Sequence, residues 1–511
     1  MNIISIKFFL FVFMLLILYY IFPKKIRWII LLFGSIVFYY LSSHKLIIFI
    51  ILSIISIYFV GLILTNINKK IKLLDKTQKE EKKKLNNKKR IILVSCIILN
   101  ILFIVLTKYY NFTLSNLNLI LSLFKIELSI KSKLLLPLGI SYYTLEAISY
   151  MVDIYRGKYE GEKNILKVAL YLMYFPNITE GPISRFNELS KEFYENNKLD
   201  FNNIFIGMDL ILIGLFKKMV IADRAGIFVN SVFGNNYGGF TIFVAIILYT
   251  LQIYAEFGGC IDIVRGISYL FGVKLPLNFK RPFFSKDVQE FWRRWHMSLG
   301  AWIKEYVFYP ISLSKLNTKV VLFAKKHTND YFFRFISAAF PLLFVWIVNG
   351  IWHGASYKYI VYGMYYYVFM MIGLLLEPLF SSIREKLKLS NTLVDIIHIF
   401  RTIIIVLFGM ALFRSSSLSE YGLLLSNLFK KSSGLLNLGL FRIDFIILVI
   451  SSFFLFLFGL LEEYKKIDFE NNFTKNVFVR SIFYTLIISS IIIFGIYGEG
   501  YNAADFIYGA F

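Results

Sequence analysis

Charge is scarce in this sequence. Only 17% of its 511 residues are Asp, Glu, Lys or Arg, whereas 58% are hydrophobic. A soluble protein of this length needs far more charge to cover its surface, so the composition excludes that class. Apolar runs of roughly 20 residues, long enough to cross a bilayer, recur from end to end. They predict an all-α, polytopic membrane protein.

Cysteine and acidic residues are also few. Cys96 and Cys260 are the only cysteines, and Cys96 stands inside an apolar run, so no disulfide framework is expected. The 32 acidic residues face 56 basic ones, which gives a formal net charge of +24. The basic residues stand in short loops between apolar runs, as the positive-inside rule requires. This pattern indicates membrane lipid as a partner, through its anionic headgroups, and no nucleic acid.

Twelve apolar runs are predicted to span the membrane. They occupy residues 3–22, 28–43, 46–65, 91–107, 134–152, 203–222, 239–257, 335–352, 358–378, 397–413, 442–461 and 480–496. The first has no small-residue cleavage site and is therefore a span rather than a signal peptide. Residues 165–192 and 283–315 mix apolar and polar side chains, which favours re-entrant or interfacial helices. No domain boundary is visible, so we predict one transmembrane domain over residues 1–511.

Two basic loops predict the orientation. Lys24, Lys25 and Arg27 follow the first span, and the loop at 69–90 holds eleven Lys or Arg. Two spans separate these loops, so both lie on one side of the membrane, and the positive-inside rule makes that side the cytoplasm.

Two of the five histidines stand in unusual surroundings. His296 lies in "FWRRWHMSLG" (291–300), and five of the six tryptophans fall between positions 292 and 352. If residues 287–306 form one helix, His296 shares an aromatic and aliphatic face with Trp292 and Trp295, and Arg294 points away. An apolar wall disfavours the charged imidazole, which suits a neutral general base. A core histidine bonded to a carbonyl is the alternative.

His353 ends an apolar run in "WIVNGIWHGASY" (346–357). Gly350 and Gly354 flank it and permit close approach of a ligand or another helix, and Asn349 adds a second polar group. Ionisable residues inside membranes mark functional sites. His296 and His353 have no third ligand nearby, so no metal site is predicted. The sequence also contains no phosphate-binding loop, no serine nucleophile elbow of the kind found in hydrolases, and no Cys nucleophile motif.

Five consecutive stretches carry a family resemblance. They are "LLLPLGISYYTLEAISYMVDIYRG", "YFPNITEGPISRF", "GLFKKMVIADRAG", "LNFKRPFFSKDVQEFWRRWHMSLGAWIKEYVFYPI" and "GIWHGA". In this order they resemble the signatures of the membrane-bound O-acyltransferases, in the branch of alginate O-acetyltransferase and the D-alanyl transfer protein of teichoic acid synthesis. The resemblance covers nearly the whole length. It implies a helical bundle with re-entrant helices around a central tunnel, in a bacterial plasma membrane.

The resemblance also assigns roles to the two histidines. The family's functional histidines map onto His296 in "FWRRWH" and His353 in "WHG". Because His353 stands between two glycines, where an acceptor could approach closely, it is expected to be the general base, and His296 to orient the thioester or donate to its carbonyl. The reverse assignment stays open.

Donor binding is expected beside His296. Trp292 and Trp295 look like part of the tunnel wall. Arg293 and Arg294 suit its cytoplasmic mouth, where guanidinium groups meet the phosphates of an acyl donor.

Two stretches depart from the family pattern. "YAEFGGCID" (254–262) stands where relatives carry aromatic-Asp-Phe-Ser-Gly-Tyr-Ser-Asp, and Glu256 and Asp262 keep acidic groups there in a supporting role. "ISLSK" (311–315) replaces the more usual Gly-Gly-Asn-Arg. These changes leave catalysis intact and bear on the identity of the acceptor or partner.

The resemblance implies an O-acyltransferase. It moves an acyl group, acetyl in the first instance, from a cytoplasmic thioester to hydroxyls of an extracytoplasmic cell-surface polysaccharide, directly or through an extracytoplasmic acyltransferase partner. The expected donor is acetyl-coenzyme A, with no bound cofactor. One alternative is D-alanyl transfer to teichoic acid from a carrier-protein thioester; another is a non-enzymatic transporter of acyl groups or polymer. The stretches at 407–429 and 497–511 favour the acetyltransferase, and the two histidines argue against a transporter.

Overall fold

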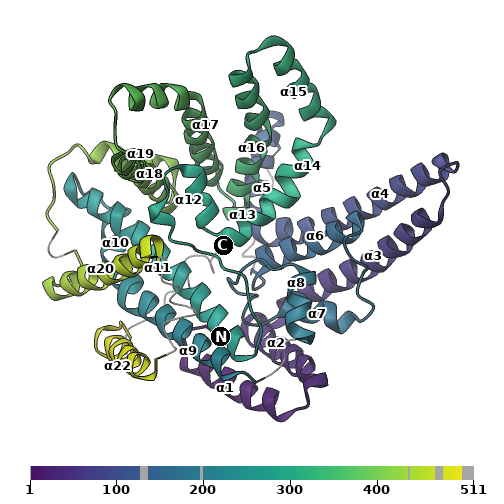
Figure 1. The fold of residues 1–511 in the computed structure, drawn as a ribbon, viewed down its shortest axis with the longest axis horizontal. Helices are drawn as coiled ribbons and strands as arrows, with labels where there is room; N and C mark the ends of the chain where they lie inside the picture. Colours follow the sequence, from purple (N-terminus) through teal and green to yellow (C-terminus); the bar gives the residue numbers. More distant parts are fainter. Residues whose placement is uncertain (1, 127–135, 196–198, 436–437, 466–475, 498–511) are drawn as a thin grey trace. The chain divides into compact units, whose positions relative to one another are not determined.

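A computed structural model describes residues 2–126, 136–195, 199–435, 438–465 and 476–497. In these ranges the regular structure is helical, and the only β pairing is an isolated bridge between Phe279 and Trp295 (Figure 1). The all-α prediction is therefore confirmed. The stretch at 498–511, which the sequence analysis used to favour an acetyltransferase, lies outside the described residues, as do positions 134 and 135 of one predicted span.

The chain divides into two compact units. The first comprises Met1–Met208 and Val264–Pro276, and the second comprises Asp209–Ile263 and Leu277–Ile507. The prediction of one transmembrane domain over the whole chain stays a prediction.

Within its described residues, the first unit contains eight helices, the first half of a ninth and the end of α11 (Phe240–Leu270). Apart from the end of α11, they are α1 (Ile6–Ile21), α2 (Arg27–Ser43), α3 (Ile47–Leu73), α4 (Lys79–Ile104), α5 (Tyr110–Leu121), α6 (Ile140–Arg156), α7 (Ile165–Met173), α8 (Phe186–Tyr194) and the first half of α9 (Phe201–Phe216). Short turns of 3₁₀ or π helix link some of them: η1 (Lys24–Ile26), η2 (His44–Leu46), η3 (Val105–Tyr109) and η4 (Ser122–Phe124).

The second unit holds the remaining helices. They are η5 (Lys217–Ala222), α10 (Asp223–Val232), most of α11 (Phe240–Leu270), η6 (Pro282–Phe284), α12 (Val288–Arg294), α13 (Met297–Ile303), η7 (Lys304–Phe308), α14 (Tyr309–Ser312), α15 (Lys315–His327), α16 (Asp330–His353), α17 (Tyr357–Lys386), α18 (Asn391–Arg414), α19 (Leu418–Asn427), α20 (Arg442–Lys465) and α22 (Val477–Phe494). Every candidate site residue from the sequence belongs to this unit.

Eight helical segments of the described chain are long and apolar enough to cross a membrane. Nine of the twelve predicted spans fall within them, because α2 and α3 form one continuous segment, Lys24–Leu73. The other three predictions fall on shorter helices: α1, α6, and α9 with its π-helical continuation η5. The protein is a multi-pass membrane protein.

The exposed side chains fit a lipid environment. On α20, Ile446, Val449 and Phe453 are each more than half exposed, as are Leu486 and Ile492 on α22. Water-facing surfaces rarely carry such continuous apolar faces, whereas hydrocarbon chains solvate them well. The two cysteines are buried, and no disulfide joins them.

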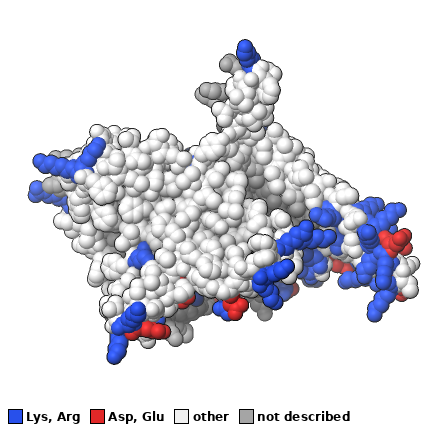
Figure 2. Space-filling view, turned by 90° about the horizontal axis from the view of Figure 1, so that it is seen from above, with Lys and Arg blue, Asp and Glu red and all other residues white. Residues whose placement is uncertain are grey.

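The basic loop at 69–90 is almost entirely helical. α3 extends to Leu73 and α4 begins at Lys79, so the charged residues continue the two helices beyond their apolar parts. Figure 2 shows Lys and Arg gathered over the end of this helix pair. Most of this basic loop is therefore a helical extension of α3 and α4.

Two of the family-like stretches meet around one buried carboxylate in the first unit. Glu146 of α6 accepts hydrogen bonds from the Asn177 side chain at 3.0 Å and from the Ser184 backbone N–H at 3.1 Å. This contact explains why an acidic residue in one stretch accompanies polar residues in the other, since a buried carboxylate must be hydrogen-bonded.

In the second unit, α16 and α17 pack with their backbones close together. A Cβ on Gly363 of α17 would lie 2.2 Å from the Trp346 carbonyl oxygen, and a Cβ on Gly350 of α16 would lie 2.4 Å from the Tyr359 carbonyl oxygen. Small residues at such crossings permit close helix contact in membranes. This packing sets the position of His353 at the end of α16.

Candidate active site

The segment around His296 is not one helix. α12 ends at Arg294, Trp295 is extended, and His296 adopts a left-handed backbone with φ 48° and ψ 52° before α13 begins at Met297. The cause is tertiary, because residues 278–280 pair with this segment. The Lys280 N–H donates to the Arg294 carbonyl at 2.9 Å, and the Met297 N–H donates to the Asn278 carbonyl at 2.9 Å.

The prediction of a single helical face over 287–306 was therefore wrong. Trp292 packs edge-to-face against Trp346 at 5.2 Å and against Tyr366 at 4.9 Å, measured between ring centroids. Trp295 instead stacks on Phe291 at 5.4 Å. A backbone pairing between distant segments leaves no trace in helical periodicity, so the sequence pattern did not reveal the break.

His296 is buried in an aromatic environment. It is 2% exposed, and its ring lies 4.9 Å from Phe257 and 5.7 Å from Trp352 between centroids. Burial lowers the pKa of His296 to about 3, because desolvation penalises the imidazolium. The sequence-based expectation of a neutral imidazole in an apolar wall agrees with this geometry.

His353 is 2% exposed and also lies among aromatic rings. Its ring contacts Trp352 at 5.0 Å, Tyr362 at 5.6 Å and Phe413 at 5.2 Å between centroids. Phe413 comes from the last turn of α18. Trp352 thus contacts both His296 and His353, so the fold brings together two histidines that stand far apart in the sequence.

The glycines beside His353 accommodate another helix. A Cβ on Gly354 would lie 2.4 Å from Cε2 of Tyr359, and Gly350 meets the backbone of the same residue. Of the two interpretations from the sequence, ligand or helix, the helix holds these positions. Asn349, one turn before His353, is 6% exposed, and its Oδ1 accepts no hydrogen bond from the described residues.

Glu256 and Asp262 are paired with two adjacent lysines. Lys217 Nζ lies 2.6 Å from Asp262, and Lys218 Nζ lies 2.9 Å from Glu256 and 2.9 Å from Asp223. A supporting role was predicted from the sequence for the two acids but not for Lys217, Lys218 or Asp223. The signal was present in "GLFKKMVIADRAG" (214–226), where two lysines and an aspartate interrupt an apolar run.

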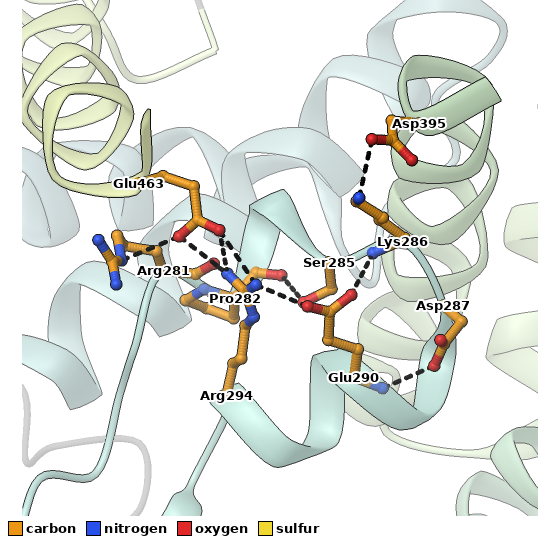
Figure 3. A network of polar contacts seen from close by, with 9 residues as sticks. All are labelled: Arg281, Pro282, Ser285, Lys286, Asp287, Glu290, Arg294, Asp395 and Glu463. Carbon is orange, nitrogen blue, oxygen red and sulfur yellow. Dashed lines mark hydrogen bonds and ion pairs between the residues drawn. The ribbon is translucent and has the colours of Figure 1, made fainter. Parts of the chain in front are cut away.

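Arg294 lies between two carboxylates (Figure 3). It is 2.6 Å from Glu290 of its own helix and 3.0 Å from Glu463 near the end of α20, which also lies 3.1 Å from Arg281. Arg293 is exposed and has no ion pair within the described ranges. Of the two arginines predicted to bind the donor, Arg293 is therefore the one whose charge is not already neutralised.

Within the described part of the chain, no group of three or more His, Cys, Asp or Glu side chains is arranged to hold a metal ion. The site consists instead of two buried imidazoles, buried amides and aromatic rings. Such a set suits proton transfer and hydrogen bonding to a reacting carbonyl.

The family follows from comparison with known proteins. Residues 36–324, more than half of the chain, match the MBOAT, membrane-bound O-acyltransferase family, and the chain belongs to it. His296 lies within the matched residues, and His353 follows them.

Similar proteins with assigned names fall into three groups. The chain is 31% identical over 266 residues to a probable alginate O-acetylase AlgI of Pseudomonas putida, covering 52% of this chain and 51% of that protein. It is 30% identical over 285 residues to a peptidoglycan O-acetyltransferase of Helicobacter pylori, covering 50% of each. It is 29% identical over 292 residues to a teichoic acid D-alanyltransferase of Bacillus subtilis, covering 54% of this chain and 68% of that one. The match thus spans about half the length of the first two relatives.

Proposed function

We propose that this protein transfers an acyl group, acetyl in the first instance, from a cytoplasmic thioester to hydroxyls of an extracytoplasmic cell-surface polysaccharide. One observation carries the proposal: His296 and His353, both buried, contact the same indole, Trp352, in a member of an acyltransferase family. Transfer proceeds directly or through an extracytoplasmic acyltransferase partner. The basic loops at 24–27 and 69–90 support the orientation with the donor side in the cytoplasm.

Acetyl transfer is favoured over D-alanyl transfer by the named relatives. Proteins named for O-acetylation of alginate and of peptidoglycan are similar to this chain at 31% and 30% identity. The D-alanyl alternative rests on the relative named for teichoic acid, at 29% identity. Acetyl-coenzyme A and a carrier-protein thioester are the corresponding donors.

The reaction needs few groups. The acceptor hydroxyl must lose a proton as its oxygen bonds to the thioester carbon, and negative charge develops on the carbonyl oxygen. The carbon–sulfur bond then breaks, and the proton goes to the leaving sulfur. The buried imidazoles of His296 and His353, which contact the same indole, supply a proton acceptor and a hydrogen-bonding partner for this sequence.

The test is transfer by the purified protein in lipid vesicles. Radiolabelled acetyl-coenzyme A and D-alanyl carrier protein would be offered separately, with alginate, peptidoglycan fragments or lipoteichoic acid as acceptors. We expect labelled acetyl ester on a polysaccharide and none with His353→Ala. Transfer of D-alanine alone would establish the alternative, and absence of transfer from both donors, with or without a partner, would refute the proposal.

Donor binding gives a separate prediction at Arg293. If its exposed guanidinium meets donor phosphates, Arg293→Ala should raise the donor KM by about threefold to tenfold while kcat changes little. The effect should shrink as salt is added, because exposed charges are screened. Steady-state kinetics at two ionic strengths measure both quantities.

Arg294→Ala is the matched comparison. Its guanidinium is held by Glu290 and Glu463, so the loss should appear in thermal stability rather than in KM. A larger rise in donor KM for Arg294→Ala than for Arg293→Ala would show that the donor displaces Glu463 and binds Arg294 instead.

A further inference from the structure

Asn278 is the polar partner of His296. It is fully buried, and its Oδ1 lies 3.3 Å from Nδ1 of His296. The same oxygen accepts the Ser298 backbone N–H at 3.0 Å and lies 2.9 Å from the Ser298 hydroxyl. Asn278 therefore supports the first turn of α13 and the imidazole at its N-terminal end together.

The contact with Ser298 identifies the oxygen of the amide. A backbone N–H only donates, so the Asn278 atom facing it must be the acceptor Oδ1. Turning the amide over would place its NH₂ group against that N–H, donor against donor, which burial makes costly. The Ser298 N–H therefore favours this orientation of Asn278 independently of His296, although the buried Nδ2 of Asn278 then has no hydrogen-bond partner among the described residues.

This orientation determines the tautomer of His296. An amide oxygen accepts, so Nδ1 of His296 must carry the proton that it donates. Because the buried imidazole is neutral at physiological pH, it has only one ring proton. Nε2 then carries a lone pair and no proton.

We infer that Asn278 is a positioning residue that holds His296 with its proton on Nδ1, which makes Nε2 the proton acceptor in acyl transfer. The inference rests on the proposed function. The acceptor O–H bond breaks and its proton moves to Nε2, while the oxygen bonds to the thioester carbon. The carbon–sulfur bond breaks, and the same proton moves from Nε2 to the sulfur, which regenerates neutral His296.

The inference selects one of the two role assignments that the sequence left open. With no proton on Nε2, His296 cannot donate a hydrogen bond from that atom to the thioester carbonyl. The reverse assignment follows, in which His296 moves the proton and His353 stabilises the charge on the carbonyl oxygen. The left-handed backbone at His296 is held in place by the pairing of its segment with residues 278–280.

The kinetic test compares two substitutions of Asn278. Asn278→Leu removes the acceptor at similar volume, and kcat should fall at least about tenfold with little change in donor KM, because the tautomer is no longer held. Asn278→Asp keeps an acceptor oxygen and adds negative charge, which stabilises the imidazolium. It should recover part of the lost activity, and the acid limb of its pH–rate profile should move to higher pH.

Asn317→Leu is the matched control. Asn317 is a buried asparagine of the same unit, 5% exposed, whose Nδ2 donates to the Ser312 carbonyl. Its replacement tests general loss of a buried amide and should leave kcat near the wild-type value. Folded Asn278→Leu protein with wild-type kcat, or an Asn278→Asp profile that coincides with wild type, would overturn the inference and reduce Asn278 to a helix cap.

Nitrogen-15 NMR tests the tautomer without the reaction. In protein labelled at histidine, with His44, His327, His353 and His398 replaced by Gln, the remaining signal belongs to His296. We expect a protonated Nδ1 and an unprotonated Nε2; the opposite pattern would refute the inference even if transfer is observed. If the expected pattern is found but no acyl is transferred, the proposed function fails and the tautomer assignment stands.

Discussion

Replacing His353 by alanine should lower the rate constant for acyl transfer by about 10²–10⁴, the range for loss of a group that moves a proton or stabilises an oxyanion. His353 and His296 both contact Trp352, and in the proposed function the two imidazoles act on the same reacting centre. The alanine variant should still insert and fold. Single-turnover transfer by purified, monodisperse protein measures the effect.

The double variant sharpens this prediction. If the two histidines act as a unit, His296→Ala combined with His353→Ala should be little slower than the poorer single variant, because such effects are not additive. His398→Ala is the control. His398 lies in α18 and is not one of the two candidate site histidines, so this variant should keep full activity. Folded His353→Ala protein with near-normal transfer would contradict the mechanism and the enzyme assignment with it.

The second large effect is on stability. Lys218→Met removes the cation that faces both Glu256 and Asp223, in a network where the three side chains are 1%, 3% and 7% exposed. Two buried carboxylates then lose their lysine, and breaking such a pair costs about 3–5 kcal/mol. Methionine keeps most of the volume, so the loss reflects charge rather than a cavity. The thermal unfolding midpoint in detergent should fall sharply.

Neutralising the carboxylates provides the control. A triple variant, Lys218→Met with Glu256→Gln and Asp223→Asn, leaves no buried charge in this network and should recover most of the lost stability. Lys217→Met should cost less, because Lys217 and Asp262 are 14% and 16% exposed and keep some solvent. A Lys218→Met protein that melts like wild type would show that the carboxylates are neutral in the folded state.

Much of the architecture follows from hydrophobicity. Apolar runs of bilayer length must be helical, because backbone groups in hydrocarbon need internal hydrogen bonds. Each of the twelve predicted spans accordingly overlaps a helix, although residues 136–139 and a few residues at the ends of other spans are not helical. The ends of the spans were predicted less well than their positions. α1, α6 and α9 are shorter than the predicted runs, because turn residues and short helical breaks hardly change the average hydropathy of a run.

The site was predicted in part. The aromatic density around His296 and the polar residues at the end of an apolar run identified both histidines, and the fold places both against Trp352. Asn278 was not selected, because a lone asparagine 18 positions before a histidine has no local signal. The pairing of Arg294 with Glu463 was equally invisible, since the two residues stand 169 positions apart.

The sequence by itself determined that this chain spans a membrane and which residues are apolar enough to do so. It also identified the ionisable residues whose burial near hydrocarbon is costly and therefore calls for a functional or structural role. These properties depend on local composition, and the bilayer acts on each segment separately. The tertiary structure decided the break at His296, the partners of Glu256, Asp262 and Arg294, and the tautomer that Asn278 imposes. Those outcomes require backbone and side chains from distant segments to meet, and hydrogen-bond direction is set only after they have met.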